Sequence, residues 1–188
     1  MTDTEMKHLG TVKLETKRLV LRRFEYADSE AAFRNWTGDP RVTEFLRWKK
    51  HSAISETQSL ARFWDGKYSD PKWYHWAIVP KDIGEAVGTI SAAIIYDDTD
   101  TIEVGYCIGR AFQNKGYTTA ALRAVIGFVF DSVGACRIEA KHDPRNPASG
   151  RVIEKCGMTY EGTLRRSQRT NKGIVDVRVY SILREEYR

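Results

Sequence analysis

Paired cysteines are missing from this sequence, which has only three cysteines among 188 residues. Cys107, Cys136 and Cys156 lack the paired spacings of a zinc site, and their odd number argues against a disulfide framework. We therefore expect no metal. All three lie in segments that we expect to be strand or helix, so they are predicted to be small buried residues in a reducing compartment.

Long apolar segments are missing as well. No run approaches the ~18 apolar residues of a membrane span, and Met1 to Leu9 lacks the apolar core of a secretory signal. The formal net charge of +5 could attract an anionic ligand but falls short of the concentrated basic stripe of nucleic-acid-binding proteins. These absences predict a soluble cytoplasmic protein with neither a membrane nor a nucleic-acid partner.

The sequence does contain enough apolar material for a core. Hydrophobic residues make up 41% and aromatic residues 11% of the chain, which can offset the entropy of ordering it. This length suits one core, because single domains usually span ~100–200 residues, and no repeat or low-complexity linker interrupts the chain. We expect residues 1–188 to form a single domain.

Apolar alternation predicts strands, and apolar residues three and four positions apart predict helices. The strands expected in the first part of the chain are Arg18–Phe24, Trp73–Val79, Ala86–Tyr96 and Thr101–Ile108. The last three should form an antiparallel meander, with a turn at Asp97 to Asp100. Two helices should lie between the first two strands, one capped by Asp28 and ending near Gly38, the other spanning Ser55–Tyr68.

The later elements follow from the same rules. A long helix should run from Gly116 to Gly134, followed by a short strand at Arg137–His142. Asn146 should cap a helix that has Pro147 at its first position and ends before Gly157.

A hairpin should complete the sheet. Its strands are expected at Thr159–Leu164 and Val175–Leu183, with a turn that contains Asn171-Lys172-Gly173. The order of elements predicts a mixed α/β fold.

The most informative stretch runs from Phe112 to Leu122 (FQNKGYTTAAL) and joins a predicted strand to a predicted helix. At such a junction several backbone N–H groups lack intrahelical partners and the helix dipole adds partial positive charge, so main chain can hold a pyrophosphate. Gly116 presents no Cβ to the phosphates. The spacing matches neither the Walker A pattern nor the Gly-x-Gly-x-x-Gly fingerprint, which disfavours nucleoside triphosphates and NAD. Taken alone, an ordinary polar helix start explains the loop equally well.

A second informative stretch runs from Asn146 to Met158 (NPASGRVIEKCGM). One face of the predicted helix, directed towards the sheet, should carry Ser149, Val152, Ile153 and Cys156. The alternative is that Asn146 is merely an N-cap and Ser149 a first-turn hydroxyl bonded to the backbone.

Both stretches contribute to one family pattern. Its residues are Glu103-Val104-Gly105-Tyr106, then Gln113, Gly116 and Thr118, then Asn146, Ser149, Glu154, Lys155 and Gly157. In this order they resemble the GNAT superfamily of N-acetyltransferases, and within it the RimJ/RimL-like branch that acetylates the N-termini of ribosomal proteins at alanine or serine. The likeness extends to Thr16–Arg22 and to residues 176–186, and so covers nearly the whole chain.

The resemblance implies an α/β (α+β) fold: a mixed, mostly antiparallel sheet of six to seven strands with a splayed central parallel pair, flanked by about four helices. Three positions depart from the family pattern. Thr118 stands where the family usually has Gly or Ala, and Met158 where it usually has Phe. Gly150 is rare at its position, and it is expected to cost the helix ~1 kcal/mol relative to alanine.

The resemblance also implies a site for acetyl-CoA, as co-substrate, between the strands Thr101–Ile108 and Arg137–His142. The pantetheine arm would pair with main chain near Cys107 and Ile108. The pyrophosphate would rest on Gln113, Asn114, Lys115, Gly116, Tyr117 and Thr118. An amine would then attack the thioester carbonyl directly, without an acyl-enzyme.

The family positions also give roles to three side chains. Glu103 is a candidate general base, because an amine must lose a proton before it attacks; an ion-pair partner is the equally weighted alternative. Ser149 is a candidate proton donor to the leaving thiolate, and Asn146 would hold the pantetheine or an ordered water. His142-Asp143 resembles an acid/base pair, but without a matching nucleophile a structural role is favoured.

The acceptor and the assembly are left open by the sequence. The amine could belong to a protein N-terminus or to a small molecule such as an antibiotic, polyamine or amino acid, and a non-catalytic acyl-CoA-binding module is a third possibility. Several aromatic residues could wall an acceptor pocket, although their spacing favours the core: Trp36, Phe45, Trp48, Trp64, Trp73 and Trp76. Either a monomer or a homodimer is expected.

Overall fold

One mixed sheet organises the molecule. The computed structural model describes residues 6–96 and 98–187, and its eight strands follow the order β1-β2-β3-β4-β5-β6-β8-β7. Neighbouring strands are antiparallel except β5 and β6, which are parallel. The strands are β1 (Leu14–Glu15), β2 (Leu19–Arg22), β3 (Tyr74–Pro80), β4 (Gly88–Tyr96), β5 (Thr101–Ile108), β6 (Arg137–His142), β7 (Thr159–Thr170) and β8 (Gly173–Leu183).

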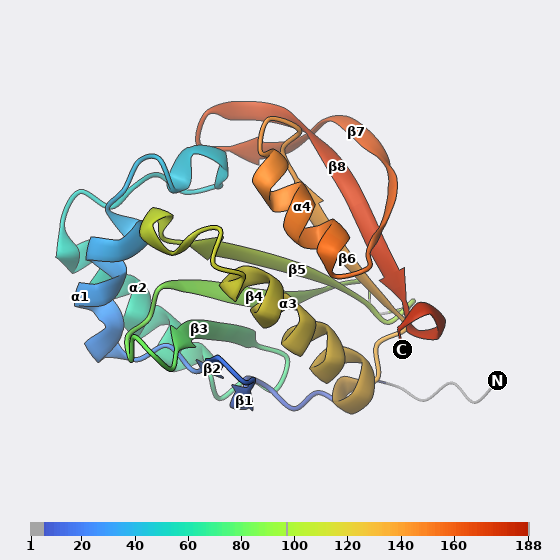
Figure 1. The fold of residues 1–188 in the computed structure, drawn as a ribbon, viewed down its shortest axis with the longest axis horizontal. Coiled ribbons are helices and arrows are strands. Elements are labelled where there is room, and N and C mark those ends of the chain that lie inside the picture. The colour runs from blue at the N-terminus through green and yellow to red at the C-terminus, as the bar shows by residue number, and fades with distance from the viewer. Residues whose placement is uncertain (1–5, 97, 188) are drawn as a thin grey trace.

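Four α-helices in the described part of the chain flank this sheet: α1 (Ser29–Ala32), α2 (Ile54–Lys67), α3 (Tyr117–Phe128) and α4 (Pro147–Lys155). Figure 1 shows α3 and α4 over one face, with α1 and α2 beside the β2–β3 end. Among the described residues no helix combines the length and the apolar character needed to cross a bilayer. The predicted mixed fold with a central parallel pair is confirmed.

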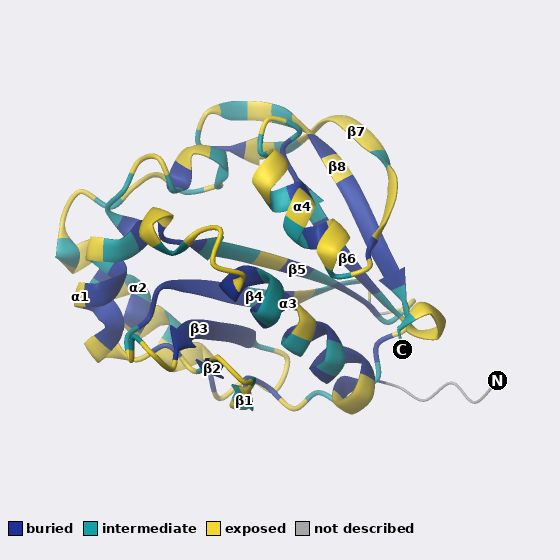
Figure 2. Ribbon diagram, in the orientation of Figure 1, coloured by how far each residue is buried: buried dark blue, intermediate teal, exposed yellow. Residues whose placement is uncertain are grey.

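Two apolar clusters show that the sheet is covered on both faces. The larger cluster joins α3 to Trp76 and Ile78 of β3, and the smaller one joins α1 and α2 to Ala77 and Val79 of the same strand. Successive side chains of a strand point to opposite faces, so β3 is buried along its whole length. Figure 2 shows β3 and β4 as largely buried and β7 as largely exposed.

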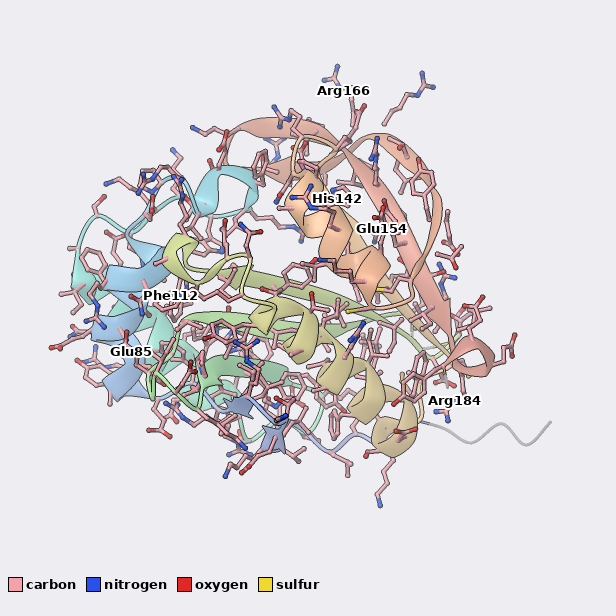
Figure 3. All side chains as sticks on the ribbon, viewed as in Figure 1. Glu85, Phe112, His142, Glu154, Arg166 and Arg184 are labelled. Carbon is pink, nitrogen blue, oxygen red and sulfur yellow. The ribbon has the colours of Figure 1, made fainter. Side chains whose placement is uncertain are left out.

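Several local predictions need correction. The sheet gains the two-residue strand β1. Both hairpin strands are longer than predicted, because β8 already begins at Gly173 and β7, at the edge of the sheet, continues beyond Leu164 to Thr170. Figure 3 shows Arg166 extending outward from this edge strand. Asp28 occupies the predicted N-cap position of α1, but its side chain makes no capping hydrogen bond; its carboxylate instead accepts hydrogen bonds from Arg22, at 2.7 and 2.8 Å. Cys136 is exposed, not buried. Residues 1–5 and Asp97, which belong to the N-terminal segment and the turn discussed above, lie outside the described residues.

The parallel strands separate before they end. Their paired residues run from Thr101↔Arg137 to Val104↔Ala140, yet β5 continues to Ile108 and remains paired with β4 as far as Gly88↔Ile108. The edge of β5 that would face β6 is therefore open over residues 105–108. Because α3 follows β5 and α4 follows β6 along the chain, both helices begin near this opening.

Gly150 has a packing role that the sequence does not reveal. A Cβ placed on it would lie 2.8 Å from Nε2 of His142, much closer than real Cβ atoms come to other atoms. The His142 ring is buried. It cannot easily move away from an added Cβ, because its Nδ1–H donates to the Asp143 carbonyl at 2.8 Å and the ring packs on Tyr180. Figure 3 shows His142 beside α4.

Replacing Gly150 with alanine should therefore destabilise the protein by about 1–3 kcal/mol, because overpacking outweighs the gain in helix propensity. The matched control is Gly66→Ala in α2, where an added Cβ meets nothing within 4 Å; this variant should gain roughly 0.5 kcal/mol. Denaturant unfolding measures both free energies. Equal stabilisation by the two alanines would show that His142 does not constrain this helix.

Candidate active site

The opening between β5 and β6 leads into a cavity of about 570 Å³. Its walls come from the ends of β5 and β6, the first turn of α4, the hairpin of β7 and β8, and a segment that runs from Trp36 to His75. Small-molecule sites typically enclose ~300–1,000 Å³, so the cavity is large enough for a substrate. Glu103, Asn146 and Ser149, which the sequence singles out, all lie on its lining.

Glu103 forms an ion pair. Lys141 Nζ lies 2.6 Å from one Glu103 carboxylate oxygen and 3.4 Å from a carboxylate oxygen of Glu139. Burial acts to lower the pKa of Lys141, but its hydrogen bond to Glu103 and the two negative charges outweigh burial and leave that pKa raised. Lys141 is therefore protonated at neutral pH, and the Glu103 carboxylate faces the cavity next to a fixed positive charge.

Ser149 contacts the hydroxyl of Tyr106 across the opening. The Tyr106 hydroxyl donates to the Ser149 carbonyl at 2.9 Å and lies 3.0 Å from Ser149 Oγ. A hydroxyl has one proton, so while Tyr106 donates to the carbonyl, the Ser149 hydroxyl donates to Tyr106. Burial raises the pKa of Tyr106 well above its ordinary value. The phenol therefore stays protonated and fixes the position of the serine.

Asn146 caps α4 as predicted. Its side-chain oxygen accepts a hydrogen bond from the Ser149 backbone N–H at 3.3 Å, and Pro147 occupies the first helical position. Asn146 is therefore an N-cap and also lines the cavity. Its role as a cap does not exclude a role in the site.

The N-terminus of α3 carries unpaired backbone donors. Among the described residues no acceptor is found for the backbone N–H groups of residues 114–119, and the first helical bond runs from Ala120 N–H to Gly116 O. Gly116 has φ +79° and Asn114 has φ +61°, so the chain turns sharply into the helix. Such a row of free N–H groups at a helix N-terminus suits a phosphate group.

A second cavity of about 140 Å³ lies between the N-terminus of α3 and α4. Asn114, Gly116 and Thr118 line it from one side, and Arg151 and Lys155 line it from α4. Two cationic side chains at spacing i, i+4 share a helix face, so this cavity offers positive charge opposite the free N–H groups. The donor set fits a diphosphate. One helix, α4, lines both cavities.

The structure brings most of the predicted site residues to these cavities. Cys107 and Asn146 line the larger one, and Asn114, Gly116, Tyr117 and Thr118 line the smaller one. Gln113 and Lys115 are exposed beside it, and Ile108 is buried in the core cluster at the end of β5. Burial raises the pKa of the Cys107 thiol, so this cysteine is not an activated nucleophile.

Sequence reasoning missed four functional candidates. Tyr106 was noted only as part of the strand motif, and Lys141 was not noted at all, because each acts through a residue about forty positions away. Arg151 and Lys155 could have been found from their helical spacing. His142 and Asp143 do not form an acid/base pair: the carboxylate of Asp143 is bound by Arg145, whose hydrogen bonds hold the pKa of Asp143 below its usual range. The described residues contain no cluster of side chains suited to a metal ion.

Asn171, in the turn between β7 and β8, connects this hairpin to a loop that lines the larger cavity. Its side-chain nitrogen lies 2.6, 2.9 and 2.9 Å from the carbonyl oxygens of Thr43, Leu46 and Trp48, and its backbone N–H donates to Leu46 O at 2.9 Å. These bonds tie the hairpin to the loop at 43–48, and the two segments lie side by side in Figure 1. Both segments contribute residues to the lining of the larger cavity, and we call this connected part of its wall the roof.

Comparisons with known proteins agree with this geometry. A family model described as an acetyltransferase (GNAT) domain matches residues 18–159. The uncharacterized N-acetyltransferase YoaA of Bacillus subtilis is 30% identical over 171 residues, which are 91% of this chain and 96% of that protein. The [ribosomal protein uS5]-alanine N-acetyltransferase of Escherichia coli is 24% identical over 162 residues, 80% of each chain.

The fold comparison leads to the same class. The crystal structure of a GNAT-family acetyltransferase from Bacillus anthracis superposes with a TM-score of 0.81 at 26% identity, covering 93% of this chain and 99% of that one. The chain therefore belongs to the GNAT family and is an N-acetyltransferase. Enzymes of this family use acetyl-CoA as the acetyl donor.

Removing the Asn171 side chain should loosen the roof. In Asn171→Ala we expect the KM for the amine acceptor to rise about tenfold, because losing hydrogen bonds worth roughly 1–1.5 kcal/mol lets the loop at 43–48 move. The KM for acetyl-CoA should change little. Steady-state kinetics with each substrate varied in turn measures both constants.

Lys172→Ala is the matched control, because Lys172 is the next residue of the same turn and its side chain is exposed. An acceptor KM that is equal in the two variants would show that the roof does not contribute to acceptor binding.

Proposed function

We propose that this enzyme transfers the acetyl group of acetyl-CoA to the α-amine of a protein N-terminus, with a ribosomal protein as the favoured acceptor. The observation that carries the proposal is the opening between β5 and β6, where a phosphate-binding helix start and a substrate cavity meet. The choice of acceptor is supported by the E. coli relative, whose name gives ribosomal protein uS5 as its substrate.

Binding of the donor follows from the two cavities. The free N–H groups of residues 114–119, with Arg151 and Lys155 opposite, would hold the diphosphate. The pantetheine arm would then extend along the open edge of β5 past Cys107, and its thioester would reach the larger cavity beside Ser149. A strand edge without a partner strand presents main-chain donors and acceptors to such an arm.

Attack needs a neutral amine. An α-amine has a pKa of ~7.7–8.0, so much of it carries a proton at neutral pH that must be removed. Glu103 is proposed as the base, acting directly or through water; its carboxylate lines the cavity and is held in place by Lys141. The nitrogen then bonds to the thioester carbon, and a backbone N–H on the open edge of β5 stabilises the oxyanion.

Collapse of the tetrahedral intermediate breaks the carbon–sulfur bond and leaves the amide and the thiolate of coenzyme A. Ser149 is proposed to give this thiolate a proton. The neighbouring Tyr106 hydroxyl, 3.0 Å from Ser149 Oγ, would hold the serine in place for this transfer. Base and acid would thus come from β5 and α4, on opposite sides of the opening.

A small-molecule amine is the second candidate acceptor. Hydrogen bonds from Asn171 fix the loop at 43–48, which lines the cavity, and a cavity of about 570 Å³ suits a compact ligand.

A coenzyme A release assay with acetyl-CoA separates these acceptors. The panel should contain peptides with free N-termini, the same peptides with blocked N-termini, and small amines. We expect release with free peptides and none with blocked ones. Release with small amines alone would overturn the choice of a protein N-terminus, and no release with any amine would overturn the proposed function.

Substitution of Ser149 and Glu103 tests their roles. Ser149→Ala should lower kcat roughly 10²-fold through loss of acid catalysis, while the acetyl-CoA Kd from calorimetry stays within about twofold. Glu103→Gln should lower kcat, because glutamine cannot accept the proton that the amine must lose. An unchanged kcat in either variant would contradict the assignment of that residue.

The matched controls are Ser132→Ala and Glu30→Gln. Both side chains are exposed and lie on other helical segments outside the two cavities. Both variants should keep the wild-type kcat.

A further inference from the structure

Aromatic side chains dominate the part of the larger cavity that lies away from the opening. They come from the segment between the first strands of the sheet and from the start of β3. The aromatic residues that line the cavity from these segments are Trp36, Phe45, Trp48, Trp64, Trp73 and His75. Trp76, which shares their part of the sequence, is instead completely buried in the core. The core prediction is therefore right for Trp76 and also for Trp36, which is buried in the smaller core cluster. Trp48, Trp64 and Trp73 are only partly buried and line the cavity.

The aromatic wall carries no charge of its own at neutral pH. Burial lowers the pKa of His75 to about 3, so its ring is neutral, and burial also lowers the pKa of His51 on the same lining. His51 Nδ1 is engaged with Thr57 Oγ1 at 2.8 Å. The imidazoles thus add flat, uncharged surface to the indole rings.

The carboxylates of the lining are already paired. Glu103 is bound by Lys141 at 2.6 Å, and Asp143 is bound by Arg145 at 2.6 Å. Arg47, on the same lining, adds a positive charge. A second ammonium group on the acceptor would find no unpaired carboxylate on this lining, and Arg47 would repel it.

The wall is held in place before any acceptor binds. Trp64 packs against Phe24 at 5.0 Å and against His75 at 4.0 Å between ring centroids. Trp48 lies near His51, at 5.5 Å, and its carbonyl oxygen accepts a hydrogen bond from Asn171. A preformed aromatic surface binds a flat apolar group without a large ordering cost.

From these observations we propose that the acceptor is a primary amine carried next to an aromatic or similarly large apolar group. The amine would lie at the opening between β5 and β6, and the apolar group would lie against Trp48, Trp64 and Trp73. The inference rests on the proposed acetyltransfer and names the acceptor's chemistry. The same chemistry has two sources: a peptide whose first residue is aromatic, or a free arylalkylamine.

A selectivity assay tests the inference. Pentapeptides that differ only in their first residue, Phe, Trp, Ala or Ser, are compared with phenethylamine and spermidine in the coenzyme A release assay. We expect kcat/KM for the Phe and Trp peptides to exceed that for the Ala and Ser peptides by at least roughly tenfold. The reason is that burying an aromatic side chain releases enough free energy for a roughly tenfold change in binding. Spermidine should be the poorest acceptor.

The outcomes separate this inference from the proposed function. Acetylation of all four peptides with equal kcat/KM would overturn the inference and leave protein N-terminal acetylation standing. Acetylation of phenethylamine but of no peptide would support the inference and overturn the peptide acceptor. Preference for spermidine, or no acetylation of any amine, would overturn the inference.

A variant of the wall supplies the second test. Trp48→Leu shortens an aromatic side chain on the loop at 43–48 and leaves the main-chain bond to Asn171 possible. The ratio of kcat/KM between the Phe and Ala peptides should fall at least fivefold, and this ratio does not depend on the folded fraction of the preparation. Tyr96→Leu, at an exposed aromatic residue of β4 outside the cavity, should leave the ratio unchanged. An unchanged ratio in both Trp48→Leu and Trp73→Leu would overturn the inference.

Discussion

The early separation of two parallel strands is the constraint on which the site depends. Pairing of β5 with β6 stops at Val104↔Ala140, while β4 keeps β5 extended to Ile108. The main chain beyond the last pair therefore has an open edge inside the molecule, where a buried backbone would normally be paired. An extended ligand arm can satisfy that edge, and the two helices that follow these strands begin near the same opening, α3 with free N–H groups in its first turn.

The secondary-structure elements of the site and the contacts between them depend on sequence in different ways. The elements themselves were predictable, because β5, β6 and α4 carry local signals: alternation, an Asn–Pro start and a glycine just past the helix. The bounds of β5 and β6 were predicted to the residue. What could not be predicted were the contacts between distant segments. The hydrogen bonds from Asn171 to the loop at 43–48 join residues more than 120 positions apart. No local pattern in a single sequence encodes such a contact.

Gly150 shows how packing can reverse a local rule. Helix propensity alone counts this glycine as a cost, and that was the expectation from the sequence. The structure explains why glycine occupies this position, because the buried ring of His142 fills the space that a Cβ would need. The departure from the family pattern at position 150 is thus coupled to the histidine at position 142. Family resemblance identified the position as unusual, but only the three-dimensional contact explains it.

Charged and neutral side chains of the cavity come mostly from different segments of the chain. The charged side chains of the cavity lie mainly at the strand ends, where Lys141 and Glu103 form an ion pair at 2.6 Å. The segment from Trp36 to His75 contributes neutral rings and the charge of Arg47. With Glu103 as the proposed base, the reacting nitrogen would lie at the strand ends and the rest of the acceptor would extend towards the rings. Tyr106 faces Ser149 on the α4 side. In the proposed mechanism the amine would meet Glu103 and the departing thiolate would meet Ser149, so the two proton transfers would use side chains from different elements and no single group would perform both.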